Sequence, residues 1–289
     1  MPPYDPQEGS KTMKPGMLSS CMKKENLSRV IDVARAAGAH YLEIGVRTGS
    51  HDFDPRTATD DYIEKLGENL RAAEITVSAL AIYDAGWILE ENRESGVELA
   101  RKTIDATVKL GCSTICMLAG FPIPGKTKIE TIKEVLPGAL KPILDYASEH
   151  GVVIALENWF RTCLQGIDTF ECLFESISDR NLGLNYDPSH LYHQEIDYIE
   201  PVRQFRDKIF HVHAKDCVVD TAKKHYAGIL SDGWWRYVIP GFGGIEWGAF
   251  ISALREIGYD GTLSIEHEDA YQTAEDGVRR GTAFLNQFC

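Results

Sequence analysis

The feature that most constrains the fold of this chain is a unit that recurs along it: an amphipathic helix, then a glycine, then a short apolar strand. Four glycines stand where a helix cap is expected, just before a strand: Gly38, Gly111, Gly151 and Gly258. Glycine suits this place because it adopts the left-handed backbone conformation without steric cost. Regular alternation of helices and strands predicts parallel strands joined by helical crossovers.

Apolar periodicity predicts eight strands, near 17–20, 41–45, 76–82, 114–118, 152–156, 182–186, 208–214 and 262–265. Helices are expected near 27–37, 60–73, 93–110, 131–150, 169–177, 196–205, up to 257, and 271–288. Eight such units favour a closed parallel (β/α)8 barrel, the TIM barrel of the α/β class, over an open sheet. The dinucleotide-binding pattern G-x-G-x-x-G does not follow the first strand. We therefore predict a single barrel domain over 1–289, with an irregular arm at about 1–15 and an inserted loop at about 217–240.

Composition and charge narrow the range of partners. Hydrophobic residues make up 44% of the chain and charged residues 25%, as in ordinary soluble proteins, and no apolar run is long enough for a membrane span. The net charge of −13 disfavours nucleic acid as a partner. Seven cysteines without a C-x-x-C pair indicate reduced thiols. No signal peptide is visible, so a cytoplasmic protein without a membrane partner is expected.

A strand with two histidines stands out within this pattern. In His211-Val212-His213-Ala214-Lys215, every second side chain points to the same face of the strand. Two imidazoles and an ammonium on one face cost free energy if that face is buried without partners. An isolated surface hairpin would also explain the pattern, but three other strands end in an acidic residue.

These strand ends predict a metal site. Strands five to eight end at Glu157, Asp187, His213 and Glu266, and the carboxyl ends of barrel strands converge on one site. Three carboxylates would repel one another without a cation. Their oxygens and one imidazole nitrogen suit Mn²⁺, Mg²⁺ or Co²⁺, with Zn²⁺ as an alternative. Strand parity selects Glu266 and leaves Glu268 in reserve.

The chain resembles the xylose-isomerase-like superfamily of sugar isomerases and epimerases, and most of all its ketose 3-epimerases. The matching pieces are Ala155-Leu156-Glu157-Asn158, Asp187-Pro188-Ser189-His190, His211-Val212-His213 and Ser264-Ile265-Glu266-His267. The resemblance implies that Glu157, Asp187, His213 and Glu266 bind a divalent metal, usually Mn²⁺. It also implies that the two glutamates exchange protons with the substrate carbon on opposite faces of an enediolate. His190 would contact substrate hydroxyls.

Two further substrate contacts are predicted. The family's substrate-binding arginine lies shortly after the histidine motif. The first arginine after that motif here is Arg236, beyond the insertion, so the resemblance carries the role to Arg236. Lys215 lies on the same strand face as His213 and is expected either to bind the developing oxyanion or to pair with the acidic ligands. Glu43, at the end of the second strand, is expected to line the pocket. The glycines of 241–244 are interpreted as a loop turn rather than a phosphate cradle.

The predicted function is that of a divalent-metal-dependent isomerase or epimerase acting on a ketose or keto-sugar. A carbon acid next to a carbonyl is very weak, so the enolate oxygen needs a Lewis acid, and carboxylates move the proton. A dehydratase of a keto-polyol, similar to inosose dehydratase, starts with the same proton abstraction. A phosphoesterase of the AP-endonuclease type would need histidines at strands two to four, whose ends have none. The two intact glutamates argue against a non-catalytic sugar-binding protein. We expect a carbohydrate substrate and a homo-oligomer, a dimer or a tetramer.

Overall fold

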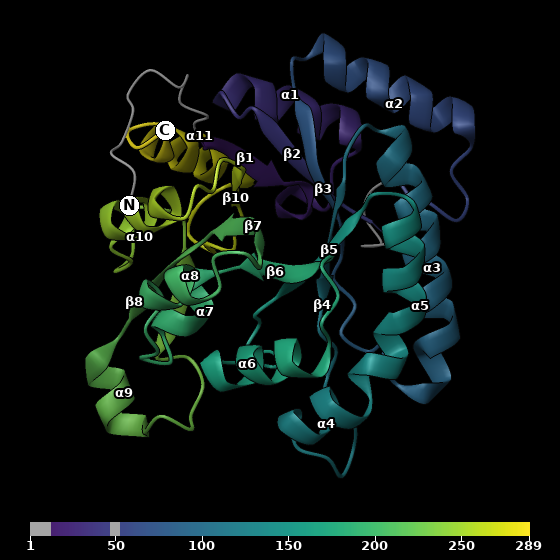
Figure 1. Ribbon diagram of the computed structural model, residues 1–289. Coiled ribbons are helices and arrows are strands. Elements are labelled where there is room, and N and C mark those ends of the chain that lie inside the picture. The colour runs from purple at the N-terminus through teal and green to yellow at the C-terminus, as the bar shows by residue number, and fades with distance from the viewer. Residues whose placement is uncertain (1–12, 47–52) are drawn as a thin grey trace, which may run out of the picture.

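The computed structural model describes residues 13–46 and 53–289, and its core is a closed barrel of eight parallel strands (Figure 1). Around the barrel the strands follow the order β1-β10-β7-β6-β5-β4-β3-β2. Their bounds are Lys14–Leu18 (β1), Tyr41–Gly45 (β2), Thr76–Ile82 (β3), Thr114–Leu118 (β4), Val153–Glu157 (β5), Leu182–Tyr186 (β6), Ile209–Ala214 (β7) and Thr262–Ile265 (β10). The predicted fold class is confirmed. Most of the predicted arm at 1–15 lies outside the described residues, and β1 already begins at Lys14.

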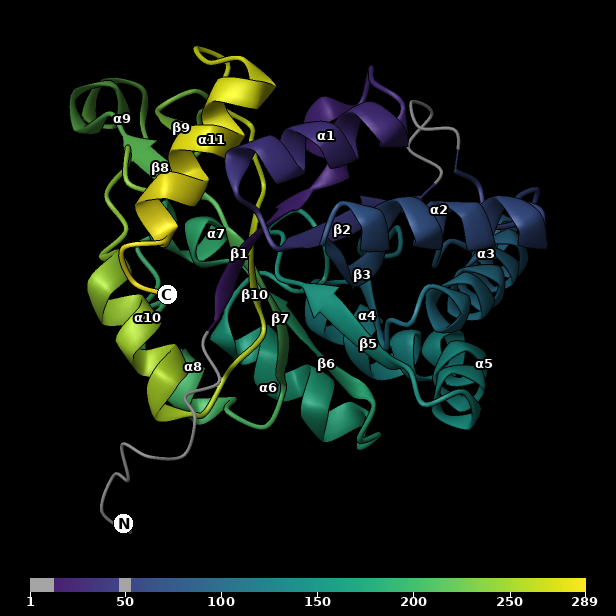
Figure 2. The same cartoon turned by 90° about the horizontal axis from the view of Figure 1, so that it is seen from above.

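Helices surround the barrel, as the view from above shows (Figure 2). Their bounds are Leu27–Ala37 (α1), Asp60–Ala72 (α2), Glu90–Lys109 (α3), Lys128–Glu134 (α4), Leu136–Glu149 (α5), Ile167–Ser176 (α6), Pro188–Tyr192 (α7), Glu200–Gln204 (α8), Thr221–Ala227 (α9), Trp247–Glu256 (α10) and Ala274–Leu285 (α11). The helix predicted over 131–150 is two helices, because a proline opens α5 at its first turn, where its missing N–H costs least. Among the described helices, none combines the length and the apolar character needed to cross a membrane.

The glycine caps are present at the predicted places. Gly38 has φ of 76°, and its backbone N–H donates to the carbonyls of Ala34 and Arg35 at the end of α1. The other three predicted caps also have positive φ: Gly111, Gly151 and Gly258. Each cap ends a helix a few residues before the next barrel strand begins, so the repeating unit in the sequence corresponds to the repeating unit of the fold.

The seven cysteines, all within the described residues, form no disulfide.

Alternation along the strands separates an apolar outer layer from a polar interior. Val212, Ala214, Leu263 and Ile265 are fully buried and belong to the main hydrophobic core. A smaller apolar cluster contains small side chains from β3, β4 and β5, namely Ala79, Ala81, Cys116 and Ala155, with Leu18. Small side chains fill little volume, and this leaves room inside the barrel for the polar groups at the strand ends.

The segment predicted as an inserted loop at 217–240 forms a β-hairpin with a helix in its connection. Strand β8 (Asp216–Val219) pairs antiparallel with β9 (Trp235–Val238), and Cys217 lies opposite Tyr237. Helix α9 lies between the two strands in sequence and has no buried residue. In both views it stands at the periphery of the molecule, beside β8 (Figures 1 and 2).

The glycine-rich loop after this hairpin surrounds a carboxylate of the chain itself. The buried side chain of Asp216 accepts hydrogen bonds of 2.8–3.1 Å from five donors, namely the backbone N–H groups of Cys217, Gly241, Gly243 and Ile245 and the indole of Trp247. A Cβ atom at Gly243 would lie 2.2 Å from the Asp216 Oδ1 atom, so only glycine fits there. The loop therefore has the form of an anion-binding turn, but the Asp216 carboxylate already occupies it and leaves no space for a phosphate.

Replacing Asp216 by asparagine is expected to lower the free energy of unfolding by about 3 kcal/mol, because the amide cannot accept all five bonds and buried donors lose their partner. Urea unfolding followed by tryptophan fluorescence measures the change. Asp207→Asn is the matched control, since the side chain of Asp207 is 92% exposed. Equal effects of the two replacements would contradict the anchoring role of Asp216.

Candidate metal centre and active site

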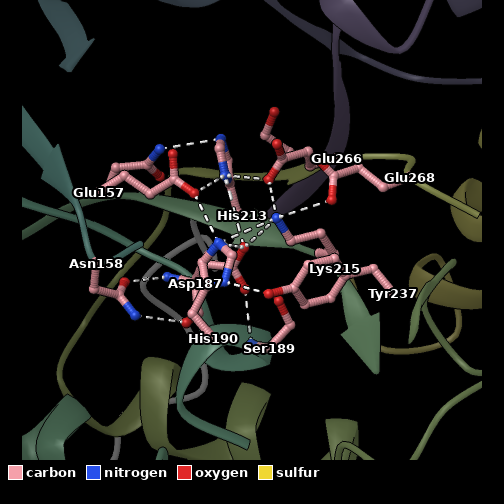
Figure 3. Close-up of polar contacts among 12 residues, drawn as sticks. Glu157, Asn158, Asp187, Ser189, His190, His213, Lys215, Tyr237, Glu266 and Glu268 are labelled. Atoms are coloured by element: carbon pink, nitrogen blue, oxygen red, sulfur yellow. Dashed lines mark hydrogen bonds and ion pairs between the residues drawn. The ribbon is translucent and has the colours of Figure 1, made fainter. Parts of the chain in front are cut away.

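Four side chains from neighbouring strands meet at the carboxyl end of the barrel (Figure 3). Glu157 ends β5, Asp187 follows β6, His213 lies in β7, and Glu266 follows β10. The pairings β5–β6, β6–β7 and β7–β10 make these strands one continuous arc. One ligand atom from each of the four residues lies within 4.8 Å of all the others. The structure thus brings together the four side chains predicted as metal ligands.

Two atoms of this cluster are buried without a hydrogen-bond partner, namely Asp187 Oδ2 and His213 Nδ1. The His213 Nδ1 atom lies 3.1 Å from Glu266 Oε2 and 3.7 Å from Glu157 Oε1. The Asp187 Oδ2 atom lies 3.2 Å from the Lys215 ammonium, though without hydrogen-bond geometry. An unsatisfied buried polar atom costs about 1–3 kcal/mol. A divalent cation would satisfy both atoms, so the residues present fit such an ion.

Surrounding groups hold Asp187 in place. The Asp187 Oδ1 atom accepts the backbone N–H of Ser189 at 2.7 Å and so caps α7, which leaves Oδ2 free for the cluster. The Asn158 amide binds the backbone of Asp187 twice, accepting from its N–H and donating to its carbonyl, each at 2.8 Å. The residue after Glu157 thus fixes the neighbouring ligand, which explains why an asparagine follows this strand end.

His213 is oriented by a buried carboxylate beneath the cluster. Its Nε2 atom lies 3.1 Å from Glu43 Oε2, and Glu43 also accepts hydrogen bonds from Ser264, at 2.7 Å, and from the Tyr83 hydroxyl. Burial raises the pKa of Glu43, but the facing imidazoles, His213 foremost, outweigh this and lower it to about 2. An ionised carboxylate that binds Nε2–H leaves Nδ1 facing the other ligands, as in other histidine metal sites. Glu43 therefore lies below the pocket rather than lining it.

A second group of possible ligands lies deeper in the barrel. It consists of Glu43, Cys116 and His211, whose ligand atoms also lie within 4.8 Å of one another. The His211 nitrogens, however, already contact Asn185 Oδ1 at 2.9 Å and Ser78 Oγ at 3.3 Å, and Glu43 has its own partners. Burial raises the pKa of the Cys116 thiol well above its ordinary value. The nitrogen and oxygen atoms of this group are satisfied, so the first cluster is the stronger candidate for a metal site.

Lys215 and His190 adjoin the acidic ligands. The Lys215 Nζ atom donates to Glu266 Oε2 at 2.6 Å, and the His190 Nε2 atom lies 3.2 Å from Glu157 Oε1. Burial lowers the pKa of Lys215, but the carboxylates of Asp187 and Glu266 outweigh it and hold that pKa well above its usual range. Lys215 is therefore charged. It pairs with the ligands, the second of its two expected roles, and it also faces the cavity.

A cavity of about 380 Å³ opens above the cluster. Its lining combines acidic, basic and aromatic side chains, namely Tyr83, Leu118, Glu157, Trp159, Phe160, Arg161, His190, Lys215, Trp235, Tyr237, Glu266 and Glu268. Polar groups and aromatic rings around a cavity of this size suit a small polyhydroxylated molecule.

Arg236, predicted to bind substrate, is not among the residues that line this cavity, and its role stays a prediction. Side chains alternate along β9, so Trp235 and Tyr237 face the cavity while Arg236 points away from it. The Arg236 guanidinium binds Asp269 Oδ1 at 2.9 Å and lies 4.6 Å from the centre of the Tyr271 ring. Arg161, which sequence reasoning did not select, is the arginine of the lining.

Removing each arginine in turn tests which of the two contacts the substrate. Arg236→Ala is expected to leave the KM of the substrate unchanged, because the side chain does not reach the cavity. Arg161→Ala is expected to raise KM by about threefold, a small effect because the side chain is 54% exposed and its charge is screened. Steady-state kinetics on both variants decide the matter, and a raised KM in Arg236→Ala alone would restore the original prediction.

Comparison with known proteins identifies the family of the chain. The family model of the xylose isomerase-like TIM barrel matches residues 31–288. An inosose isomerase of Bacillus velezensis is 27% identical over 273 residues, covering 90% of this chain and 91% of that protein. A ketose 3-epimerase of Arthrobacter globiformis is 23% identical over 260 residues, covering 87% of this chain and 81% of that protein.

 

An inosose dehydratase of Geobacillus thermodenitrificans is 26% identical over 155 residues, which is 51% of this chain and 51% of that protein. Among solved structures, the IOLI protein with a bound zinc atom superposes with a TM-score of 0.77 at 23% identity, covering 96% of this chain and 98% of that chain. The match of the family model over most of the sequence shows that the chain belongs to the xylose isomerase-like TIM barrel family.

Proposed function

We propose that the protein is a divalent-metal-dependent isomerase or epimerase of a ketose or keto-sugar, in which Glu157 and Glu266 form the acid–base pair. The observation that carries the proposal is the four-residue cluster with two unsatisfied ligand atoms, open to a cavity that both glutamates line. A bound divalent cation supplies positive charge that stabilises the oxyanion of an enediolate. Mn²⁺ is the proposed ion, with Mg²⁺, Co²⁺ or Zn²⁺ as alternatives.

The two glutamates are placed to act on one carbon from two directions. They come from β5 and β10, the two ends of the arc β5-β6-β7-β10, and lie on either side of His213 (Figure 3). Burial raises the pKa of each carboxyl, but the neighbouring imidazoles of His190 and His213 lower that of Glu157, and the charge of Lys215 lowers that of Glu266. Both are therefore ionised and ready to accept a proton.

The proton balance of the reaction follows from this arrangement. One carboxylate takes the proton from the carbon next to the carbonyl, and the C–H electron pair forms the enediolate. The other glutamate, after taking up a proton from solvent, protonates the opposite face of that carbon and inverts its configuration, and the first glutamate then releases its proton to solvent. Return at the neighbouring carbon, together with transfer of the hydroxyl proton from the oxygen of that carbon to the former carbonyl oxygen, moves the carbonyl, which is isomerisation. In both cases the number of protons on the substrate is unchanged.

A dehydratase of a keto-polyol is the second candidate, because a third carboxyl group lines the cavity. The Glu268 Oε2 atom lies 3.9 Å from the Lys215 ammonium, on the same side of the cluster as Glu266 (Figure 3). A dehydratase needs a group that protonates the departing hydroxyl after the first proton is removed. Glu268 is the available residue for that step.

Proton exchange in D₂O tests the proposed function. The protein is loaded with Mn²⁺ and incubated with a panel of ketoses and inososes, and NMR and mass spectrometry follow deuterium in each compound. We expect deuterium to enter at one carbon next to the carbonyl, with an epimer or an isomer as the product. Loss of water from the substrate would instead favour the dehydratase. Metal-loaded protein that exchanges no proton in any member of the panel would overturn the proposal.

A further inference from the structure

A chain of polar contacts runs from Glu157 away from the metal cluster to the inserted hairpin. The Glu157 Oε1 atom lies 3.2 Å from His190 Nε2, and His190 Nδ1 lies 2.8 Å from the Tyr237 hydroxyl. The same hydroxyl lies 3.2 Å from His193 Nε2. Figure 3 shows the Tyr237 side chain reaching from the hairpin to His190. The insertion therefore touches a group that contacts a proposed catalytic residue.

The outer end of this chain is buried and fixed. His193 stacks on Trp235, with ring centroids 4.7 Å apart and planes 9° apart, so two residues of the hairpin hold the polar chain. Burial, together with the nearby charges of His190 and Lys215, lowers the pKa of His193 to about 3. His193 is therefore neutral and carries a single N–H.

The surroundings of each nitrogen set the direction of the hydrogen bonds. His190 Nε2 faces two carboxylate oxygens, Glu157 Oε1 at 3.2 Å and Asp187 Oδ2 at 3.6 Å, which favours a proton on that nitrogen. With the proton on that nitrogen, His190 Nδ1 would accept from the Tyr237 hydroxyl, whose oxygen could in turn accept from His193 Nε2–H. Every donor in the chain points toward Glu157.

One contact favours the opposite assignment. The Lys215 ammonium lies 3.2 Å from the same His190 Nε2 atom, which would accept a hydrogen bond from it if the proton were on Nδ1. Both arrangements use the same heavy-atom positions, so the donor that reaches Nδ1 decides between them. Tyr237 is that donor.

We propose that Tyr237 is a positioning residue that holds His190 in the tautomer with its proton on Nε2. His190 then presents a donor to Glu157 and to a substrate hydroxyl in the cavity, and the inserted hairpin becomes part of the catalytic apparatus. The effect of Tyr237 on turnover rests on the proposed function. The tautomer of His190 can be measured whether or not that function is correct.

The tautomer is measured in the metal-loaded protein without substrate. Protein with ¹⁵N-labelled histidine is loaded with Zn²⁺, which is diamagnetic, and long-range ¹H–¹⁵N correlation spectra identify which ring nitrogens carry protons. A His190→Gln variant assigns the His190 signals by their absence. We expect a protonated Nε2 and a bare Nδ1 at His190 in the wild type. In Tyr237→Phe, which keeps the ring and its contact with Lys215, we expect part or all of the proton to move to Nδ1.

The matched control is Tyr186→Phe, which also removes one buried hydroxyl. The Tyr186 hydroxyl donates to the Tyr198 carbonyl at 2.9 Å and has no contact with His190. Its spectrum at His190 is expected to equal that of the wild type. A proton on His190 Nδ1 in the wild type would overturn the proposal, as would a Tyr237→Phe spectrum identical to that of the wild type.

Kinetics provide a second readout. Tyr237→Phe is expected to lower kcat by about tenfold, the effect of one hydrogen bond, with bound metal unchanged. Tyr186→Phe is expected to change kcat by less than about twofold, and equal losses in the two variants would contradict a specific role of Tyr237. If the wild type turns over no substrate, the proposed function fails, and the tautomer measurement still decides the role of Tyr237.

Discussion

Replacing Glu157 or Glu266 by glutamine is expected to lower turnover by at least about 100-fold, the lower end of the contribution of a general acid–base group. Glutamine keeps one oxygen that can bind a metal but cannot accept the substrate proton. Both side chains line the cavity and belong to the four-residue cluster. Steady-state kinetics combined with metal analysis of each variant measure the two effects separately.

The two variants should also differ from each other. Each one keeps a base on one face of the substrate carbon, so one epimer of the substrate should still exchange its proton with D₂O while the other does not. Glu268→Gln is the control, because Glu268 lines the same cavity but does not belong to the four-residue cluster. A Glu266→Gln protein that interconverts both epimers at the wild-type rate would show that Glu266 is not part of the pair.

Removing the metal is expected to abolish turnover and to lower the melting temperature by several degrees. A ligand present at 1,000 times its dissociation constant stabilises the folded state by about 4 kcal/mol, and this contribution disappears with the ion. Without it, three carboxylates share one buried site, where Lys215 and His213 neutralise only part of their charge.

Calorimetry and activity assays before and after chelation, and again after addition of Mn²⁺, test this expectation. In Asp187→Asn one ligand is weakened, so a higher Mn²⁺ concentration should be needed for the same recovery. Full activity in a chelated sample in which elemental analysis detects no metal would contradict the assignment of a metal-dependent reaction.

The barrel strands could be predicted well because strands buried on both faces read as short apolar runs. The exception is β1, which begins at Lys14 although the prediction placed a strand at 17–20. Its Pro15 and Gly16 do not look like strand residues. A Cβ atom at Gly16 would lie 2.5 Å from Thr262 Oγ1, so glycine is required there by contact with a strand far along the chain. No local sequence pattern indicates a contact between residues so far apart in the chain.

The metal cluster could be predicted for a similar reason, since each ligand is the polar end of an apolar strand and the barrel brings those ends together. The rest of the site depends on tertiary contacts. Arg236 and Tyr237 are neighbours in sequence, and only the register of the β8–β9 hairpin decides which of them faces the cavity. The pairing of Glu43 with His213, and the donors around Asp216, likewise join residues distant in the chain.

Because β10 lies between β1 and β7, the proposed metal site can be complete only after the last barrel strand has been synthesised. Among the barrel strands, β1 is the first and β10 the last to leave the ribosome, and they pair directly, with Lys14 beside Thr262. Glu266 directly follows β10, so a nascent chain offers at most three of the four ligands until the barrel can close. If the proposed metal binds there, its retention would distinguish the closed barrel from shorter intermediates of the chain.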